Sequence, residues 1–312
     1  MVWKKCLSAI CIITFIFLYS CHGISDLGQT PELTPLTQGF KTSAAIGYCT
    51  SLAYTAFTGG SLPTNATFSS NTTTGYSNAG IIHASISANS PLPFNHEIGD
   101  IYIAGLWDDV SQGGVLSIFF GNYDLLSSSV RIYGLYLIPI SHDPVTGNLQ
   151  AVFAQEDILL GEGTDTLLDL SLSKPKFDAA LDRLNGTSST NTFTAVTQNV
   201  WFISVDPKGT LSDLYDDVVT VNGGGQIVEA NSTSGGILYH AMIGTVFCYS
   251  ACASNPTAGT AFVQNFKASG SSVDLGNFTM NFHSTCDGRA DVLLATGKYA
   301  ASTGKTIALG WN

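Results

Sequence analysis

Short segments of apolar or alternating residues recur along the chain from residue 80 onward, bounded by Gly, Asn and Ser. Alternation with a period of two is typical of half-buried β-strands, and many short strands between turn signals indicate an antiparallel sandwich or a barrel. We therefore predict a mainly β fold, either an antiparallel sandwich or a barrel-like domain. The expected strands span residues 80–87, 100–107, 114–121, 129–140, 149–155, 193–205, 236–250, 260–266, 273–283, 290–296 and 306–311.

The connections between these segments carry turn chemistry. "HDPVTGN" at 142–148 and "VDPKGT" at 205–210 both place Asp-Pro shortly before Gly, as tight hairpin turns do. The segment "KPKFDAALDRLNG" differs, because Pro175 suits a helix N-terminus and its apolar residues fall on one helical face. This pattern predicts one short helix near residues 175–185.

The N-terminus has the three zones of an export signal. Lys4 and Lys5 precede an apolar run at 6–19, and the small residues Ser20 and Cys21 follow it. The run has about 14 residues, whereas a membrane span needs about 20. It is therefore too short to anchor the protein by itself.

Leu18-Tyr19-Ser20-Cys21 resembles the lipobox of bacterial lipoproteins, with an aliphatic residue at −3, a small residue at −1 and an obligatory cysteine. Tyr19 departs from the small residue usual at −2, a departure that spirochaetal lipoboxes tolerate, so the chain looks most like a spirochaete-type surface lipoprotein. The resemblance covers about 20 residues. It implies a diacylglyceryl thioether on Cys21 and cleavage before it. An ordinary signal with an incidental cysteine is the alternative.

This resemblance implies a domain order and a location. Residues 1–20 are expected to be the signal peptide, 21–45 the lipid attachment and a flexible tether, and 46–312 a β-rich globular domain. Residues 22–45 are rich in Pro, Gly and polar residues without apolar periodicity, which favours a tether. In this family Asp after the cysteine often retains a protein at the inner membrane. His22 occupies that position, which favours the outer membrane or cell surface.

The charge balance excludes several partners. The chain has 12 basic and 23 acidic residues and a net charge of −11, and removing the signal takes away Lys4 and Lys5. Nucleic-acid binding and attachment to anionic lipid both depend on clustered Lys and Arg. We therefore expect no nucleic-acid partner, and membrane contact only through the N-terminal lipid.

Four cysteines remain after Cys6, Cys11 and Cys21 are set aside. An even number in an exported protein suggests two disulfides. In a continuous strand Cys248 and Cys252 would lie roughly 13 Å apart, too far to bond, so each is expected to pair with Cys49 or Cys286. Free buried thiols are one alternative. A zinc site is another, although the usual C-x2-C spacing is absent.

No motif assigns catalytic chemistry, a cofactor or a metal. The sequence contains no G-x-S-x-G and no H-E-x-x-H. Carboxylates near turns, at 108–109 and 213–217, could bind Ca²⁺, but solvated turn residues are the more common interpretation. An exposed subset of the aromatic residues could form a binding patch. The aromatic candidates are Tyr48, Tyr54, Phe57, Phe119, Phe120, Tyr123, Trp201 and Trp311.

Two functional hypotheses follow. The first is a lipid-anchored surface protein with a binding or structural domain, including adhesion to host extracellular-matrix or plasma proteins or to environmental macromolecules. The second is an exported hydrolase that acts on glycans through two carboxylates about 5–10 Å apart. A polar cleft with such a pair would favour the hydrolase, and exposed aromatic residues on a sheet would favour binding.

Overall fold

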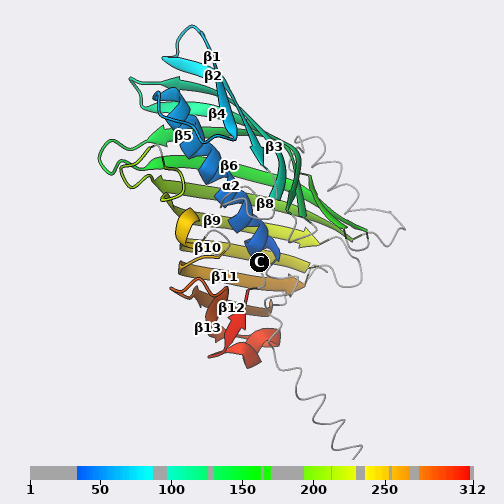
Figure 1. Cartoon of the computed structure of the whole chain (residues 1–312). Helices are drawn as coiled ribbons and strands as arrows, with labels where there is room; N and C mark the ends of the chain where they lie inside the picture. Colours follow the sequence, from blue (N-terminus) through cyan, green and yellow to red (C-terminus); the bar gives the residue numbers. More distant parts are fainter. Residues whose placement is uncertain are drawn as a thin grey trace, which may run out of the picture.

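The computed structural model describes residues 34–86, 97–125, 130–162, 165–169, 193–211, 213–229, 236–252, 255–267 and 274–309. They form one 14-stranded sheet with a long helix, α2, lying across one of its faces (Figure 1). The elements are α2 (Thr34–Phe57), β1 (Ala66–Asn71), β2 (Asn78–Ile86), β3 (Glu97–Asp108), β4 (Gly113–Leu125), β5 (Val130–His142), β6 (Leu149–Glu162), β7 (Asp165–Asp169), β8 (Phe193–Asp206), β9 (Val218–Glu229), β10 (Gly236–Cys248), α4 (Tyr249–Cys252), β11 (Ala258–Lys267), β12 (Asp274–Phe282), β13 (Arg289–Ala295), η2 (Gly297–Ser302) and β14 (Thr306–Ala308).

The sheet is almost entirely an antiparallel meander, which confirms the prediction of a mainly β fold. Its strand order is β1-β2-β3-β4-β5-β7-β6-β8-β9-β10-β11-β12-β13-β14. The exception is β7, which lies between β5 and β6 and runs parallel to β5. The strands do not close into a barrel, since β1 and β14 stand at opposite ends of this order.

The two predicted turns have different outcomes. Residues 142–148 form the hairpin between β5 and β6, in which the amide of Asp143 donates to the carbonyl of Asn148. Residues 205–210 end β8 but do not join it tightly to β9, which begins only at Val218. The intervening segment folds back, and the buried side chain of Leu214 holds it against the core.

The strand predictions missed β1, β7 and β9. Strand β9 contains three consecutive glycines at 223–225, which resemble a turn in sequence. The backbone explains the first of them, because Gly223 has φ +128° and an added Cβ would lie 2.1 Å from the carbonyl oxygen of Val200. The helix predicted near residues 175–185 lies outside the described residues.

Helix α2 corrects the predicted domain boundary. Residues 34–45 were expected to belong to a tether, but they form the first half of this helix, and Leu36 and Phe40 are buried. Every residue from 42 to 57 is buried. A helix covered on all sides needs no apolar stripe on one face, so it shows no helical periodicity in sequence. The tether prediction for residues 21–33 lies outside the described residues.

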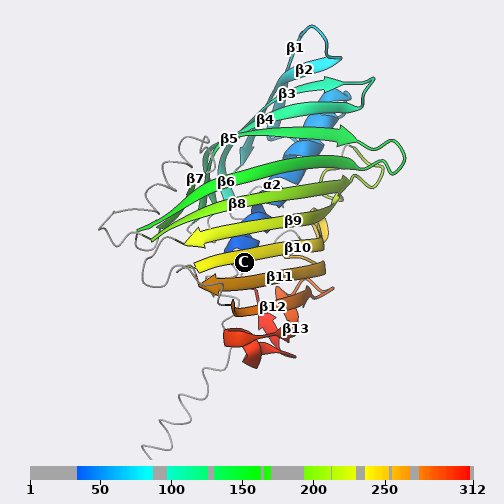
Figure 2. The ribbon, with the colours of Figure 1, turned by 180° about the vertical axis from the view of Figure 1, so that it is seen from behind.

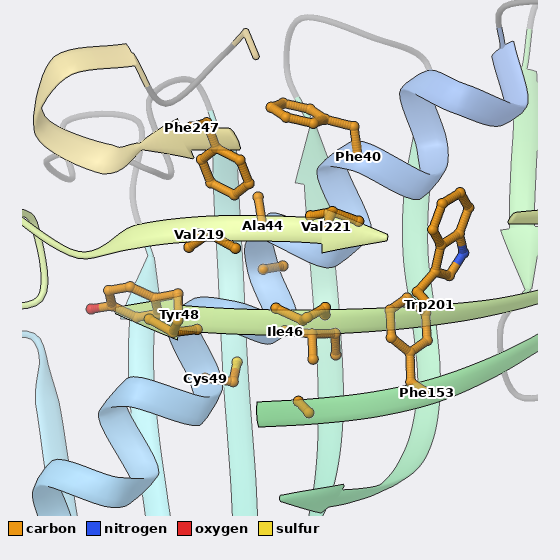
Figure 3. Close-up of a cluster of buried hydrophobic side chains, with 14 of the residues drawn as sticks. Phe40, Ala44, Ile46, Tyr48, Cys49, Phe153, Trp201, Val219, Val221 and Phe247 are labelled. Atoms are coloured by element: carbon orange, nitrogen blue, oxygen red, sulfur yellow. The ribbon is translucent and has the colours of Figure 1, made fainter. Parts of the chain in front are cut away.

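The N-terminal half of α2 packs against the middle of the sheet (Figure 3). The ring of Phe40 lies edge-on to that of Phe247 on β10, with centroids 4.8 Å apart. Trp201 of β8 lies against the helix backbone at Gly39, where an added Cβ would come within 2.2 Å of the indole. The Tyr249 hydroxyl donates to the carbonyl of Ala44 at 2.7 Å. These contacts fix the helix to β8 and β10.

The C-terminal end of α2 packs against strands from the other half of the sheet. Tyr54 contacts Trp107 of β3 with ring centroids 5.2 Å apart, and Phe57 contacts Phe68 of β1 at 5.8 Å. Between its two ends the helix also contacts β6 and β9. A single buried helix therefore joins strands that are far apart in the sheet order, and it leaves the opposite face of the sheet without a covering layer among the described residues (Figure 2).

Candidate binding surface

The face of the sheet turned away from α2 is seen from in front in Figure 2 and is hereafter called the outer face. It carries exposed large apolar side chains. They alternate along each strand with the buried residues that contact the core, as the strand period requires. The extent of exposure is large, reaching 72% for Leu137 and 52% for Phe202. The set comprises Ile81, Tyr102, Phe119, Leu137, Val200, Phe202, Tyr239 and Ile243.

The strand register places one uncharged row across the outer face. Directly paired residues on neighbouring strands point to the same face of a sheet. One stretch of the row crosses β2 to β5 and the other crosses β6 to β13. The stretches are Ile81–Ala104–Ser117–Leu137 and Ala154–Val200–Gly224–Ala241–Phe262–Thr279–Leu294.

An aromatic cluster lies beside this row on β2, β3 and β4. The imidazole of His83 stacks on the ring of Tyr102 with centroids 4.6 Å apart and an interplanar angle of 11°. Tyr102 in turn contacts Phe119 at 6.3 Å. Asp100 orients the imidazole, since its Oδ1 lies 2.9 Å from His83 Nε2. The cluster presents partly exposed rings together with one paired carboxylate.

The most perturbed carboxyl group lies away from the outer face, beside α2. Asp217 is 1% exposed, and neither of its oxygens has a hydrogen-bond partner among the described residues. Burial raises the pKa of Asp217 to about 7, and the nearby carboxylates of Asp216 and Asp213 also raise it. The nearby Ser51 hydroxyl has the opposite, smaller effect and lowers the pKa of Asp217, because it favours the charged carboxylate. The two side chains are not joined by a hydrogen bond of good geometry. The site is closed to solvent, so it offers no access to a substrate.

A second cluster of ionisable groups lies at the connection between β12 and β13 and on β13 itself. His283 Nδ1 lies 2.7 Å from Asp287 Oδ2, and His283 Nε2 lies 3.1 Å from Asp291 Oδ1. Hydrogen bonds from the imidazole to these two carboxylates raise the pKa of His283. A glycosidase needs an open space for the scissile bond between its carboxyl groups. Here the imidazole fills that space, so this pair does not have the geometry of the predicted hydrolase.

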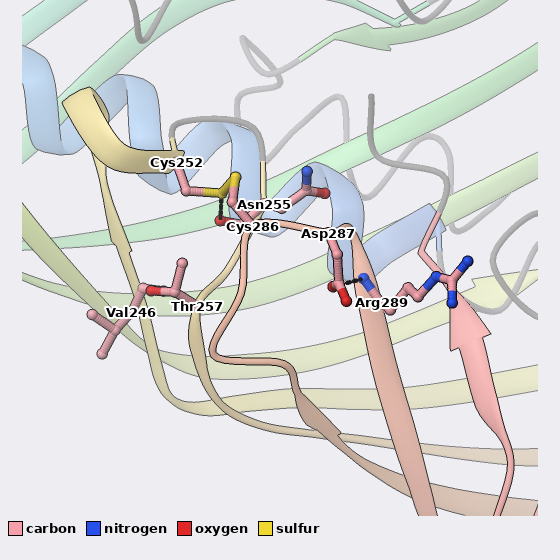
Figure 4. The surroundings of a disulfide bond; sticks show 7 residues. All are labelled: Val246, Cys252, Asn255, Thr257, Cys286, Asp287 and Arg289. Atoms are coloured by element: carbon pink, nitrogen blue, oxygen red, sulfur yellow. Dashed lines mark hydrogen bonds between the residues drawn. A yellow bond between two sulfur atoms is a disulfide. The ribbon is translucent and has the colours of Figure 1, made fainter.

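The cysteines fulfil the disulfide prediction only in part. Cys252 and Cys286 form a disulfide that ties the end of α4 to the loop before β13 (Figure 4). Cys49 and Cys248 are free, so their predicted pairing is wrong. Cys49 lies inside α2 within the core, where burial raises the pKa of its thiol. The predicted separation of Cys248 and Cys252 is also wrong, because α4 turns the chain and places them opposite each other.

The carboxylates of the β3–β4 turn, which were considered for Ca²⁺, accept local hydrogen bonds. Asp108 accepts from the amides of Val110 and Ser111, and Asp109 accepts from the Trp107 indole. These bonds hold the β3–β4 turn in place. Within the described part of the chain, no group of three His, Cys, Asp or Glu side chains is arranged to hold a metal ion.

The aromatic candidates separate into core and surface. Tyr48, Tyr54, Phe57 and Trp201 are buried, whereas Phe119 is exposed on the outer face. Side chains of Phe120 and Tyr123, and all of Trp311, lie outside what the structure describes, as does Cys21. The exposure of Phe202 and Leu137 was not predicted from sequence. Alternation of apolar residues predicts a strand, but it does not show which face of the sheet is covered by another layer.

Among the described residues, none of the helices is long and apolar enough to cross a membrane. Comparison of the chain with protein-family models, with curated proteins and with solved structures gave no match.

Proposed function

We propose that the protein is a lipid-anchored envelope protein whose β-rich domain has a binding or structural role, and that the outer face is its contact surface. The sequence Leu18-Tyr19-Ser20-Cys21 supports the lipid anchor and a location at the outer membrane or cell surface. The outer face supports the contact surface. Contiguous exposed apolar patches are uncommon on soluble monomers and mark interaction sites.

The observation that carries this proposal is an uncharged row with exposed aliphatic side chains, together with the exposed aromatic side chains that lie beside it. Tyr and Phe are enriched at interfaces because a large rigid ring buries much area at a small cost in conformational entropy. Tyr102 and Phe119 supply such rings beside the row, Leu137 adds apolar area within it, and Phe202 adds apolar area next to it on β8. Host extracellular-matrix or plasma proteins and environmental macromolecules are the candidate partners of this face.

The anchor is tested by metabolic labelling with a radioactive fatty acid, followed by detergent phase partition. The wild-type chain should take up label and enter the detergent phase, whereas Cys21→Ala should take up none and remain as unprocessed precursor. An unlabelled wild-type protein in the aqueous phase would show that Cys21 is an incidental cysteine and that the protein is simply secreted.

The contact surface is tested by adhesion of cells that carry the full chain to immobilised matrix and plasma proteins. Leu137→Glu and Phe202→Glu should each reduce adhesion by about ten-fold, because a carboxylate buried without a partner opposes association. Val145→Glu is the matched control, since Val145 is 91% exposed but lies in the β5–β6 turn away from the row. Equal adhesion of all three variants and the wild type would exclude the outer face as the surface that binds these partners.

The exported hydrolase remains a separate hypothesis. The described carboxylates beside an imidazole, Asp287 and Asp291, do not favour it, because His283 occupies the space between them. A hydrolysis assay on soluble glycans with the wild-type chain would test it directly.

A further inference from the structure

Both faces of the sheet carry large apolar side chains, although among the described residues a helix covers only one of them. Antiparallel sheets commonly pack one face on a core and leave the other polar and solvated. Here the inner face contacts α2, while the outer face presents Ile81, Leu137, Phe202 and Ile243 to solvent. The outer face therefore has the composition of a surface that another layer covers.

We propose that a second copy of this chain covers the outer face, with the two sheets packed face to face around a two-fold axis. This proposal rests on the proposed function, in which the outer face is the contact surface, and it names a second copy of the chain, in place of a host or environmental macromolecule, as the occupant of that face. Sheets that pack face to face form a layer about 10 Å thick in which side chains from both sheets interdigitate. A two-fold interface requires only that one patch be complementary to itself.

The exposed area is sufficient for a dimer. Large apolar side chains that are about half exposed leave roughly 100 Å² each to be buried. The eight exposed side chains of the outer face therefore provide about 800 Å² per chain, which is the contribution of each partner to a standard-size interface. At the small residues of the row, the partner's side chains can also contact the backbone of the sheet.

The shape of the row favours interdigitation. Small residues, among them Ala104, Gly224 and Ala241, are interspersed across the strands with larger ones such as Leu137 and Phe262. Large side chains of one copy can therefore enter the spaces above small residues of the other, as in the cores of β-sandwiches. A row of uniformly large side chains would hold two sheets apart.

The charges of the outer face favour an uncharged partner. The row contains no charged residue, although the chain as a whole carries a net charge of −11. At the margins of the face, the carboxylates of Asp100, Asp206 and Asp291 are each paired with a neighbouring His or Lys side chain. Binding of a cationic partner would need unpaired carboxylates on this face, and binding of anionic lipid would need Lys or Arg. The row of a second copy is uncharged, so its binding needs neither.

The test is photo-crosslinking of the full chain in intact cells. A photoreactive phenylalanine analogue replaces Phe202 in one variant and, as the matched control, Val145 in another. Phe202 lies in the outer face, and an aromatic analogue preserves its packing, whereas Val145 is more exposed than Phe202 but lies in the β5–β6 turn. Retention of the Cys252–Cys286 disulfide on non-reducing gels shows that each variant has folded.

The expected product at position 202 is an adduct with twice the mass of the chain, in which mass spectrometry finds peptides of this chain on both sides of the link. Its yield should exceed that at position 145 by about ten-fold, and adding Leu137→Glu should lower it by about ten-fold because a carboxylate would be buried without a partner between the two sheets.

Two other products would overturn the proposal in different ways. An adduct with a different protein or with lipid would refute self-association but keep the outer face as the contact surface. Yields at position 202 no higher than those at position 145 would refute both self-association and the proposed contact surface.

Discussion

Replacing Asp217 by Asn should change how the stability of the protein depends on pH. Burial raises the pKa of Asp217 from 3.8 to about 7, so the folded state holds a proton that the unfolded state releases. Stability from this group is fully present below pH 3.8 and is lost as the pH rises through 7. The loss is about 1.4 kcal/mol per pH unit, or up to about 4 kcal/mol over the whole interval.

Asn cannot ionise, so the variant lacks this loss. The free energy of unfolding of Asp217→Asn minus that of wild type should therefore grow from pH 4 to pH 8, approaching about 4 kcal/mol, on top of any constant offset from the amide. His240 has the opposite effect, because burial lowers its pKa to about 4 and stability from this group is lost as the pH falls from 6.5 through 4. His240 is present in both proteins, so its contribution cancels in the difference.

Urea unfolding followed by tryptophan fluorescence at closely spaced pH values provides the assay. Asp213→Asn is the matched control, because Asp213 lies on the same segment but is exposed, and its hydrogen bond from the amide of Tyr215 can be kept by Asn. A stability difference between Asp217→Asn and wild type that stays constant from pH 4 to pH 8 would refute the reasoning. So would an equal pH dependence in the Asp213→Asn variant.

Three further outcomes are expected. Gly39→Ala should lower the free energy of unfolding by about 1–3 kcal/mol, because the new methyl group would overlap the Trp201 indole, and thermal melts would show it as a lower Tm. Replacing Cys252 and Cys286 together by Ser should destabilise the protein by about 4 kcal/mol in the chain-entropy model, since the bond closes a 34-residue separation; unchanged urea midpoints would contradict this. In a maleimide assay on native protein, Cys49 should stay unlabelled until urea unfolds the core, because it is fully buried.

Most of the strands could be predicted from sequence because each of them has its own apolar or alternating pattern, whereas β1, β7 and β9 were missed. The hairpin at 142–148 was predictable for the same reason, since its residues specify a local turn. Helix α2 could not be predicted, because burial on every side removes the apolar stripe by which helices are recognised. Its Ser, Thr and Gly residues resemble a tether until the surrounding sheet is known.

The candidate surface could not be predicted, because the residues of a single strand do not show which of its two faces is exposed. Alternation identifies two sets of residues on a strand, but it does not show which set meets α2. The exposure of Phe202 follows only from the position of the helix on the other face of the sheet. The free state of Cys49 and Cys248 was likewise hidden, because cysteine parity does not report that one thiol lies within a buried helix.

The hydrogen bond from Tyr249 to the carbonyl of Ala44 has a consequence for the order of folding. It joins residues 205 positions apart, whereas most neighbouring strands of the meander are joined by short connections. Hairpins can therefore form early, because their strands are close in sequence. Helix α2 is synthesised before the sheet, but it can contact β8 and β10 only after most of the chain has been synthesised. We expect strand pairing to precede helix docking. During synthesis, α2 would then emerge before the sheet and remain without it the longest, and it is the segment that a chaperone would have most time to hold.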